Sequence, residues 1–299
     1  MSALSDTIAA GHFAITAEIT PPLSANPIDL LAKSDVLKGK VDAVNVTDGA
    51  SARAHMSSVA AAYLLLQSGI EPVLQLTCRD RNRIALQSDM LGAAALGVEN
   101  LLILGGDDPS AGDQPDAKPV FDYKSRELME CAHQMRSDAT LPSGREIKVP
   151  PKLFIGGADT PMNPADDRWN PEALIAKINA GAGFLQTQFC FDPEIVREYA
   201  VGLIEQGISE KAGVLIGIGP LASAKSARWM RENLWGTTIP DELIDRLEGA
   251  ENQKAEGIDI CAELIANYST IEGISGVHLM APLGVDAIPI AIEKSGVRH

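Results

Sequence analysis

Short apolar runs recur along the chain, and each is followed by a longer stretch in which apolar residues return at helical spacing. The runs are nearly continuous in apolar character rather than strictly alternating, which is typical of parallel strands covered on both faces. Most of the runs end in a small or polar residue, as expected where a strand ends. The sequence therefore predicts eight strands. They are His12–Glu18, Asp42–Thr47, Pro72–Thr77, Asn100–Gly106, Lys152–Gly157, Phe184–Phe189, Gly213–Ile218 and Gly276–Met280.

The stretches between these runs predict helices, because their apolar residues recur three or four positions apart. Two of them carry clear end signals: Ser68-Gly69 follows one stretch, and Asn170-Pro171 opens another with an N-cap residue and a proline in the first turn. The predicted helices with the clearest pattern are Met56–Gln67, Arg83–Leu96, Pro171–Ala180, Pro193–Glu205 and Ala255–Asn267.

Strand and helix alternate eight times, so we predict a (β/α)₈ TIM barrel, ahead of a doubly wound open sheet. No linker divides the chain, and residues 1–299 are predicted to form a single barrel domain. Two segments exceed a minimal barrel. Asp107–Pro119 directly follows a predicted strand and is a candidate active-site loop, and Trp235–Ser275 predicts two extra helices before the last strand.

Composition narrows the kind of partner that this chain can have. The 40 acidic and 25 basic residues give a net charge of −15, which argues against nucleic acid or an anionic membrane as the main partner. The four cysteines lie far apart, and neither they nor the histidines show metal-ligand spacing. No apolar run approaches the roughly 20 residues of a membrane span, and the N-terminus lacks a signal-peptide pattern. We expect a cytoplasmic protein that binds no metal and associates with copies of itself.

Candidate chemistry follows from the fold, because functional residues of such barrels lie at the carboxyl ends of strands and in the loops after them. Glu18 and Asp107 are carboxylates at two such ends, and a pair of this kind suits proton transfer. Each also has a structural interpretation, Glu18 as a carboxylate that caps a loop and Asp107 as part of the tight turn GGDDPS. The same rule selects Thr47, Asp48, Gln75, Thr77, Gly105, Gly106, Gly156, Gly157, Gln186 and Gln188.

Two further segments carry candidate binding groups. The segment Cys78–Arg83, CRDRNR, places three arginines where they could hold a phosphate or a carboxylate, although we favour a solvated loop with internal Arg–Asp pairs. Gln186 and Gln188 stand in an otherwise apolar strand. A glutamine at a barrel mouth offers a donor and an acceptor to the edge of a pterin or flavin ring, unless neighbouring backbone satisfies it.

These segments together resemble methylenetetrahydrofolate reductases, from about Phe13 to Met280. The similarity is to the divergent branch of the family found in acetogens, as the segments AVNVTDG and LTCRDRNRIALQSD indicate. Some members of that branch work with a partner subunit. The segments that carry the resemblance are AEITPP at Ala17–Pro22, AVNVTDG at Ala43–Gly49, LQLTCRDRNR at Leu74–Arg83, ALGVENLLILGGDDP at Ala95–Pro109 and KINAGAGFLQTQFCFD at Lys177–Asp192.

The resemblance implies reduction of 5,10-methylenetetrahydrofolate to 5-methyltetrahydrofolate by a flavin, either FAD or FMN, with NADH or NADPH as the electron donor. It implies that Glu18 is the general acid that protonates the folate nitrogen and opens its ring to an iminium. By the same match, Asp107 lies beside the flavin and the pterin, and Gln188 contacts the folate.

The resemblance also implies a cofactor-binding set. Thr47, Gly106 and Lys177 match positions that line the flavin, with Lys177 near its phosphate-bearing chain. Some positions differ from the family pattern: Gln75 replaces a histidine, Gly105 replaces an arginine, and Ala224 stands where a phenylalanine is expected. The predicted cofactor-binding residues are Thr47, Gln75, Gly105, Gly106, Asp107, Gly157 and Lys177.

Two alternative functions stay open at this point. A methyltetrahydrofolate-dependent methyltransferase would need the pterin contacts but no flavin. A folate- or flavin-binding subunit would act only together with a partner enzyme. Because barrels host many chemistries, the fold does not choose among these functions. The set of Glu18, Asp107 and Gln188 favours the reductase.

Overall fold

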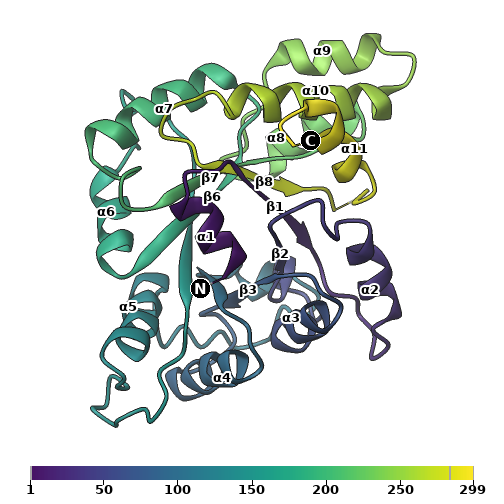
Figure 1. Ribbon diagram of the computed structural model, residues 1–299. Helices are drawn as coiled ribbons and strands as arrows, with labels where there is room; N and C mark the ends of the chain where they lie inside the picture. Colours follow the sequence, from purple (N-terminus) through teal and green to yellow (C-terminus); the bar gives the residue numbers. More distant parts are fainter. Residues whose placement is uncertain (1, 283, 299) are drawn as a thin grey trace.

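A closed barrel of eight parallel strands forms the centre of the molecule (Figure 1). The computed structural model describes residues 2–282 and 284–298. The strands follow one another around the barrel in chain order, and the last pairs with the first, which confirms the predicted (β/α)₈ fold. They are β1 (Ala14–Ile19), β2 (Ala43–Val46), β3 (Pro72–Thr77), β4 (Asn100–Leu104), β5 (Phe154–Asp159), β6 (Ala182–Phe189), β7 (Gly213–Ile218) and β8 (Gly276–Met280).

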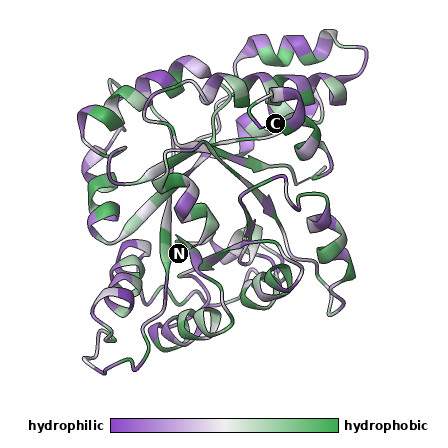
Figure 2. Cartoon of the chain, in the orientation of Figure 1, coloured by the Kyte–Doolittle hydropathy of each residue, from purple (hydrophilic) through white to green (hydrophobic). Residues whose placement is uncertain are grey.

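Helices surround the barrel and present one side to it (Figure 1). Figure 2 shows hydrophobic and hydrophilic residues alternating around these outer helices, as expected when one face of each packs against the strands. No helix within the described part of the chain is long and apolar enough to cross a membrane. The helices are α1 (Ala3–Ala9), α2 (Ile28–Asp35), α3 (Ser58–Gln67), α4 (Arg83–Ala95), α5 (Ser125–Ser137), α6 (Pro171–Asn179), α7 (Pro193–Glu205), α8 (Ala224–Asn233), α9 (Asp241–Gly249), α10 (Gln253–Tyr268) and α11 (Ala287–Ser295).

The predicted strands differ from the observed ones mainly at their ends. Strands β3, β7 and β8 have the predicted bounds, whereas β5 lies two residues later than predicted. Its pairing begins at Phe154, which lies opposite the first residue of β4, so Lys152 comes too early to join the sheet. Strand β4 ends at Leu104 rather than at Gly106, whose φ of +95° leaves the extended conformation.

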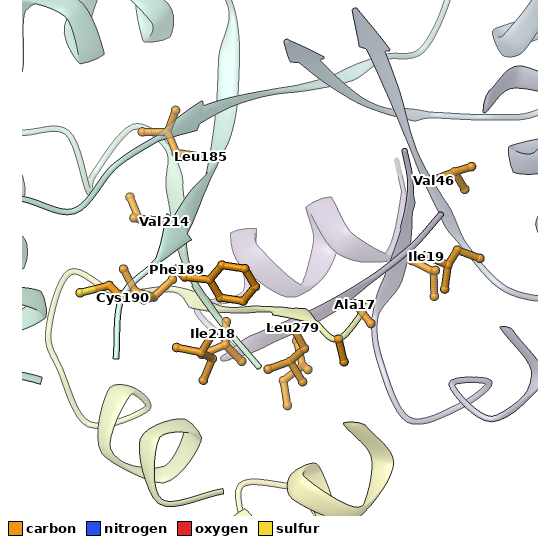
Figure 3. Packing of buried hydrophobic residues seen from close by; sticks show 14 of the residues in the cluster. Ala17, Ile19, Val46, Leu185, Phe189, Cys190, Val214, Ile218 and Leu279 are labelled. Carbon is orange, nitrogen blue, oxygen red and sulfur yellow. The ribbon is translucent and has the colours of Figure 1, made fainter. Parts of the chain in front are cut away.

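Side chains alternate between two environments along each strand. Ala17, Ile19 and Val46 belong to the large apolar core between the strands and the helices (Figure 3). Inside the barrel, an apolar layer closes the amino-terminal end, where Leu4 of α1 packs against it. The strand residues of this layer are Ala14, Ala43, Val73, Leu102, Phe184 and Leu215.

The two segments beyond a minimal barrel differ in structure. The predicted pair of extra helices is confirmed as α9 and α10. The candidate loop Asp107–Pro119 contains only one turn of 3₁₀ helix, η2 (Pro109–Ala111), which packs against another such turn, η1 (Ala50–Ala52). A Cβ at Gly112 would lie 1.9 Å from the carbonyl oxygen of Ala52, so only glycine permits this close approach. The loop after β4 is thereby held against the loop after β2.

Candidate active site

Glu18 lies near the end of β1 with its side chain 25% exposed toward the barrel mouth. Gln75 of β3 donates a hydrogen bond from its Nε2 to Glu18 Oε2 at 2.7 Å. The Nε2 atom of His278, in β8, lies 3.6 Å from the same oxygen. Two neighbours from different strands therefore face one carboxylate oxygen, and among the described residues no hydrogen bond engages the other, Oε1.

A buried polar layer lies directly below Glu18 inside the barrel. The Nδ1 atom of His278 lies 2.9 Å from Thr16 Oγ1. Gln186 Nε2 donates to Thr16 Oγ1 and to Asn45 Oδ1, both at 3.0 Å, and Asn45 Nδ2 donates back to Gln186 Oε1 at 2.6 Å. All four side chains are almost fully buried. Every member of this layer thus has a polar partner, as buried polar groups require.

Sequence reasoning missed part of this layer. The candidate residues selected from the sequence include no histidine, yet His278 lies beside Glu18. The available signal was strand alternation: His278 is a polar residue within the apolar run GVHLM, as Gln186 is within its own strand. The same signal identifies Thr16, two residues before Glu18, and Asn45, two residues before Thr47.

The ends of β2 and β4 contain several predicted cofactor-binding residues. Thr47 is buried, and its Oγ1 has no hydrogen-bond partner among the described residues. Gly105 is exposed, and a Cβ built on it would meet no atom within 4 Å. Asp107 is also exposed; its main-chain oxygen accepts a hydrogen bond from Arg79 Nη1 at 3.3 Å. Within the described residues, the Asp107 carboxylate neither pairs with a cation nor contacts Glu18, so its proposed role stays a prediction.

The arginines of the CRDRNR segment form ion pairs within the protein. Arg79 binds Asp80 at 2.7 Å, and Arg81 binds Asp48 at 2.7 Å. The favoured interpretation of internal Arg–Asp pairs is therefore confirmed for Arg79 and Asp80 only, because Arg81 pairs outside the segment. The expected solvation is wrong for Arg79, which is 4% exposed. Arg79 lies between the loops after β2 and β4 and also donates to the main-chain oxygen of Gly49 at 3.2 Å. These arginines hold strand ends and loops together.

Gly157 does not face the barrel mouth, which corrects its predicted place among the cofactor-lining positions. A Cβ at Gly157 would lie 2.7 Å from Met129 Cε of α5, on the helix side of the sheet. Alternation along β5 turns the neighbouring Gly156 inward, toward the ring of Phe184, and Gly157 outward.

Lys177 of α6 caps the end of β5. Its Nζ donates to the main-chain oxygen of Ala158 at 2.6 Å and lies 3.7 Å from Asp159 Oδ1. Burial raises the pKa of Asp159, although Lys177 and the hydroxyl of Tyr199, at 2.5 Å, oppose this effect. Lys177 also lines a cavity of about 340 Å³ together with Trp235, so it stays accessible beside the mouth.

Gln188 is anchored at the end of β6. Its Oε1 accepts a hydrogen bond from the main-chain nitrogen of Phe189 at 2.9 Å, and its Nε2 donates to the main-chain oxygen of Trp235 at 3.2 Å. The alternative of a glutamine bound by backbone is therefore confirmed in this structure. A contact between Gln188 and folate stays a prediction.

Two cavities lie at the carboxyl end of β8. One, of about 420 Å³, is lined by Glu18 and Lys33. The other, of about 230 Å³, lies between α8 and the ends of β7 and β8, and Met280, which pairs with Glu18 in register, belongs to its wall. Its wall is mainly apolar and includes Trp229, while Lys254 is the one charged residue among its described lining residues.

Comparison with known proteins adds to this geometry. The sequence model of the family described as methylenetetrahydrofolate reductase matches residues 3–295. Over 230 residues the chain is 26% identical to a probable methylenetetrahydrofolate reductase (NADPH) of Caenorhabditis elegans, an alignment that covers 75% of this chain and 32% of that protein. Over 262 residues it is 24% identical to methylenetetrahydrofolate reductase 2 of Schizosaccharomyces pombe, covering 83% of this chain and 39% of that protein. The chain thus spans well under half the length of these two relatives.

A third relative is of similar length to the chain. The 5,10-methylenetetrahydrofolate reductase of Pectobacterium carotovorum subsp. carotovorum is 24% identical over 276 residues, which cover 90% of this chain and 85% of that protein. Among solved structures, an uncharacterized protein from Clostridium thermocellum that binds two copies of 5-methyl-5,6,7,8-tetrahydrofolic acid superimposes with a TM-score of 0.64. It is 16% identical and covers 98% of this chain and 97% of its own, a likeness that supports the fold.

Proposed function

Because the chain belongs to the methylenetetrahydrofolate reductase family, we propose that it reduces 5,10-methylenetetrahydrofolate to 5-methyltetrahydrofolate, with Glu18 as the general acid. The observation that carries this proposal is the arrangement at Glu18. Gln75 and His278 both face Oε2, and no described residue forms a hydrogen bond with the other carboxylate oxygen. A carboxyl group held in this way can deliver a proton to a substrate in a fixed direction.

The substrate chemistry explains why a proton donor is needed. In methylenetetrahydrofolate one carbon bridges two nitrogens, and protonation of one nitrogen weakens its bond to that carbon. Ring opening leaves a cationic carbon centre that accepts hydride. Glu18 therefore has to approach the leaving nitrogen with its free oxygen while Gln75 keeps the carboxyl group from rotating.

The residues at the ends of β2 and β4 fit a flat, polar cofactor. The buried hydroxyl of Thr47 lacks a partner within residues 2–282 and 284–298, and Gly105 leaves open space where a side chain would stand. These residues would hold the ring, and Lys177 would lie toward a phosphate-bearing chain. A reduced flavin, FAD or FMN, bound there and regenerated by NADH or NADPH, would supply the hydride.

The apolar cavity beside β8 suits the rest of the substrate. Folates carry an aromatic arm that ends in glutamate, and this cavity combines apolar walls and Trp229 with the cation Lys254. It begins at Met280, the register neighbour of Glu18. We place the aromatic arm in this cavity and the glutamate carboxylates near Lys254, because apolar walls with a few polar groups are typical of ligand pockets.

The first experiment follows the visible absorbance of the purified protein without oxygen. Reduced nicotinamide nucleotide should bleach the flavin bands, and methylenetetrahydrofolate should restore them. A colourless protein that flavin cannot reconstitute would contradict the proposal and favour a flavin-independent folate enzyme, such as a methyltransferase, or a subunit that needs a partner.

The variant Glu18→Gln separates the two half-reactions. The amide has the size of the carboxyl group but donates no acidic proton, so reduction of the flavin by the nucleotide should persist while reduction of the folate falls by at least about 100-fold. Rapid-mixing absorbance measures both rates. If both half-reactions kept near-normal rates, the assignment of Glu18 as the acid would be wrong.

A further inference from the structure

We propose that His278 is a positioning residue for Glu18 and that the buried layer of Thr16, Asn45 and Gln186 fixes the orientation of its ring. The inference rests on the proposed function, since it assigns a role in delivering the Glu18 proton. It concerns residues that are almost fully buried below Glu18. His278 itself is 3% exposed.

The two nitrogens of His278 face different environments. Nδ1 lies 2.9 Å from the hydroxyl of Thr16 inside the barrel, and Nε2 lies 3.6 Å from Glu18 Oε2 above it. A turn of the ring would break the contact with Thr16 and leave a buried nitrogen without a partner, which is unfavourable. The ring therefore keeps Nε2 directed at the carboxyl group.

The layer below determines which ring nitrogen carries the proton. Asn45 and Gln186 exchange two hydrogen bonds, in which Gln186 Nε2 lies on the side of Thr16. Gln186 then donates to Thr16 Oγ1, so the Thr16 hydroxyl can donate its own proton elsewhere. The nearest acceptor is His278 Nδ1 at 2.9 Å, whereas the main-chain oxygen of Val277 lies at 3.5 Å. The geometry points to a His278 ring whose Nδ1 accepts the Thr16 hydrogen bond and whose Nε2 carries a proton.

An Nε2–H group in this place acts on the charge that Glu18 acquires. When Glu18 gives its proton to the substrate nitrogen, its carboxylate becomes negative, and the N–H groups of Gln75 and His278 both face Oε2. At 3.6 Å the histidine contact is longer than a direct hydrogen bond, so it acts as an oriented dipole. His278 keeps its own proton throughout, and Glu18 regains one from water at the mouth after each turnover.

The ring orientation can be tested without any catalytic assay. Long-range ¹H–¹⁵N correlation spectra distinguish the two neutral tautomers of histidine, and the chain contains only five histidines. The signal missing from the spectrum of His278→Gln identifies residue 278. We expect the tautomer with the proton on Nε2 in the wild type and a changed tautomer balance in Thr16→Val, which removes the hydroxyl but keeps the volume. A wild-type ring with its proton on Nδ1 would overturn the inference.

The catalytic consequence is tested with conservative pairs of variants. Thr16→Val and His278→Leu should slow folate reduction about tenfold while the dissociation constant for folate and the rate of flavin reduction stay unchanged. Thr16→Ser and His278→Gln, which restore a hydroxyl and an N–H donor, should recover most of that loss. Thermal melting confirms that each variant is folded.

Two outcomes separate this inference from the proposed function. An active wild type whose Thr16→Val and His278→Leu variants reduce folate at the normal rate would overturn the role of His278 and leave the reductase assignment intact. A wild type that reduces no folate with any donor would overturn the proposed function, even if the Nε2 tautomer were observed.

Discussion

Asp48 shows how a residue at the end of a barrel strand can serve structure alone. Its carboxylate accepts hydrogen bonds from Ser58, from the main chain and hydroxyl of Thr77, and from both terminal nitrogens of Arg81. Burial alone would raise the pKa of Asp48, but the bonds and charge of Arg81, with those of Thr77, hold it below its ordinary value. Asp48 therefore ties β2 to β3 beneath the mouth.

This lowered pKa predicts a pH dependence of stability. A carboxyl group whose pKa is lower in the folded than in the unfolded chain stabilises the fold above its unfolded pKa, about 3.9, and loses this effect as pH falls toward the folded value. Asp48→Asn should therefore lower the free energy of unfolding by about 3–5 kcal/mol at neutral pH, because it breaks a buried ion pair. The loss should be smaller in acid. Urea unfolding of both proteins between neutral pH and pH 3 measures the difference.

Asp89 provides the control, since it pairs with the same arginine at 2.9 Å. Burial raises the pKa of Asp89, so its charge does not favour folding and Asp89→Asn should cost little at neutral pH. Equal losses from Asp48→Asn and Asp89→Asn would show that Arg81 pairing alone, rather than the lowered pKa of Asp48, determines stability here.

At the scale of elements, alternation of strand and helix was enough to predict the barrel. Each strand is an apolar run long enough to be recognised, and β3, β7 and β8 were predicted with their observed bounds. The loops were less predictable, because their form depends on contacts between distant segments, such as that of Gly112 with Ala52. Glu18 could be selected from its place at a strand end. The role of His278 could not, since it depends on which residues of other strands lie at the same height in the barrel.

The contact between the loops after β2 and β4 predicts the effect of a small substitution. Gly112→Ala would place a methyl group 1.9 Å from the carbonyl oxygen of Ala52, so the loop that carries Asp107 must move. We expect a loss of about 1–3 kcal/mol in the free energy of unfolding, as is typical of overpacking, and slower folate reduction. Differential scanning calorimetry and steady-state kinetics measure the two effects.

Gly92 of α4 is the matched control for this substitution. A Cβ there meets no atom within 4 Å, and alanine favours a helix more than glycine does, so Gly92→Ala should stabilise the protein by roughly 0.5–1 kcal/mol. If Gly112→Ala were as stable and active as Gly92→Ala, the close approach of the two loops would not matter for the site.

At the scale of the whole molecule, elements far apart in the chain share the proposed substrate site. Glu18 comes from β1, Met280 from β8, Trp229 from α8 and Lys254 from α10. The net charge of −15 repels a dianionic glutamate from most of the molecule, whereas Lys254 is positively charged. As the one cation among the described residues of the cavity wall, Lys254 should therefore matter for binding.

Lys254→Gln should raise the KM for methylenetetrahydrofolate about tenfold and leave kcat unchanged, because it removes an ion pair made equally in the ground and transition states. The same variant should not change the KM for methylenetetrahydropteroate, which lacks the glutamate. Lys225→Gln removes an equal charge from an exposed position of α8 that does not line the cavity and should affect neither substrate. A KM for the folate that is the same in both variants would exclude Lys254 from the site.

The apolar layer that closes the barrel beneath the polar layer also limits how the proton of Glu18 exchanges with solvent. With Leu4, Phe184 and their neighbours sealing the interior, the proton of Glu18 can exchange with solvent only through the mouth. A bound folate covers that route, so the acid enters each turnover with the isotope it acquired beforehand. Because the open mouth lets this proton exchange before folate binds, folate reduction in heavy water should be slower from the first turnover onward, whichever water the enzyme was stored in.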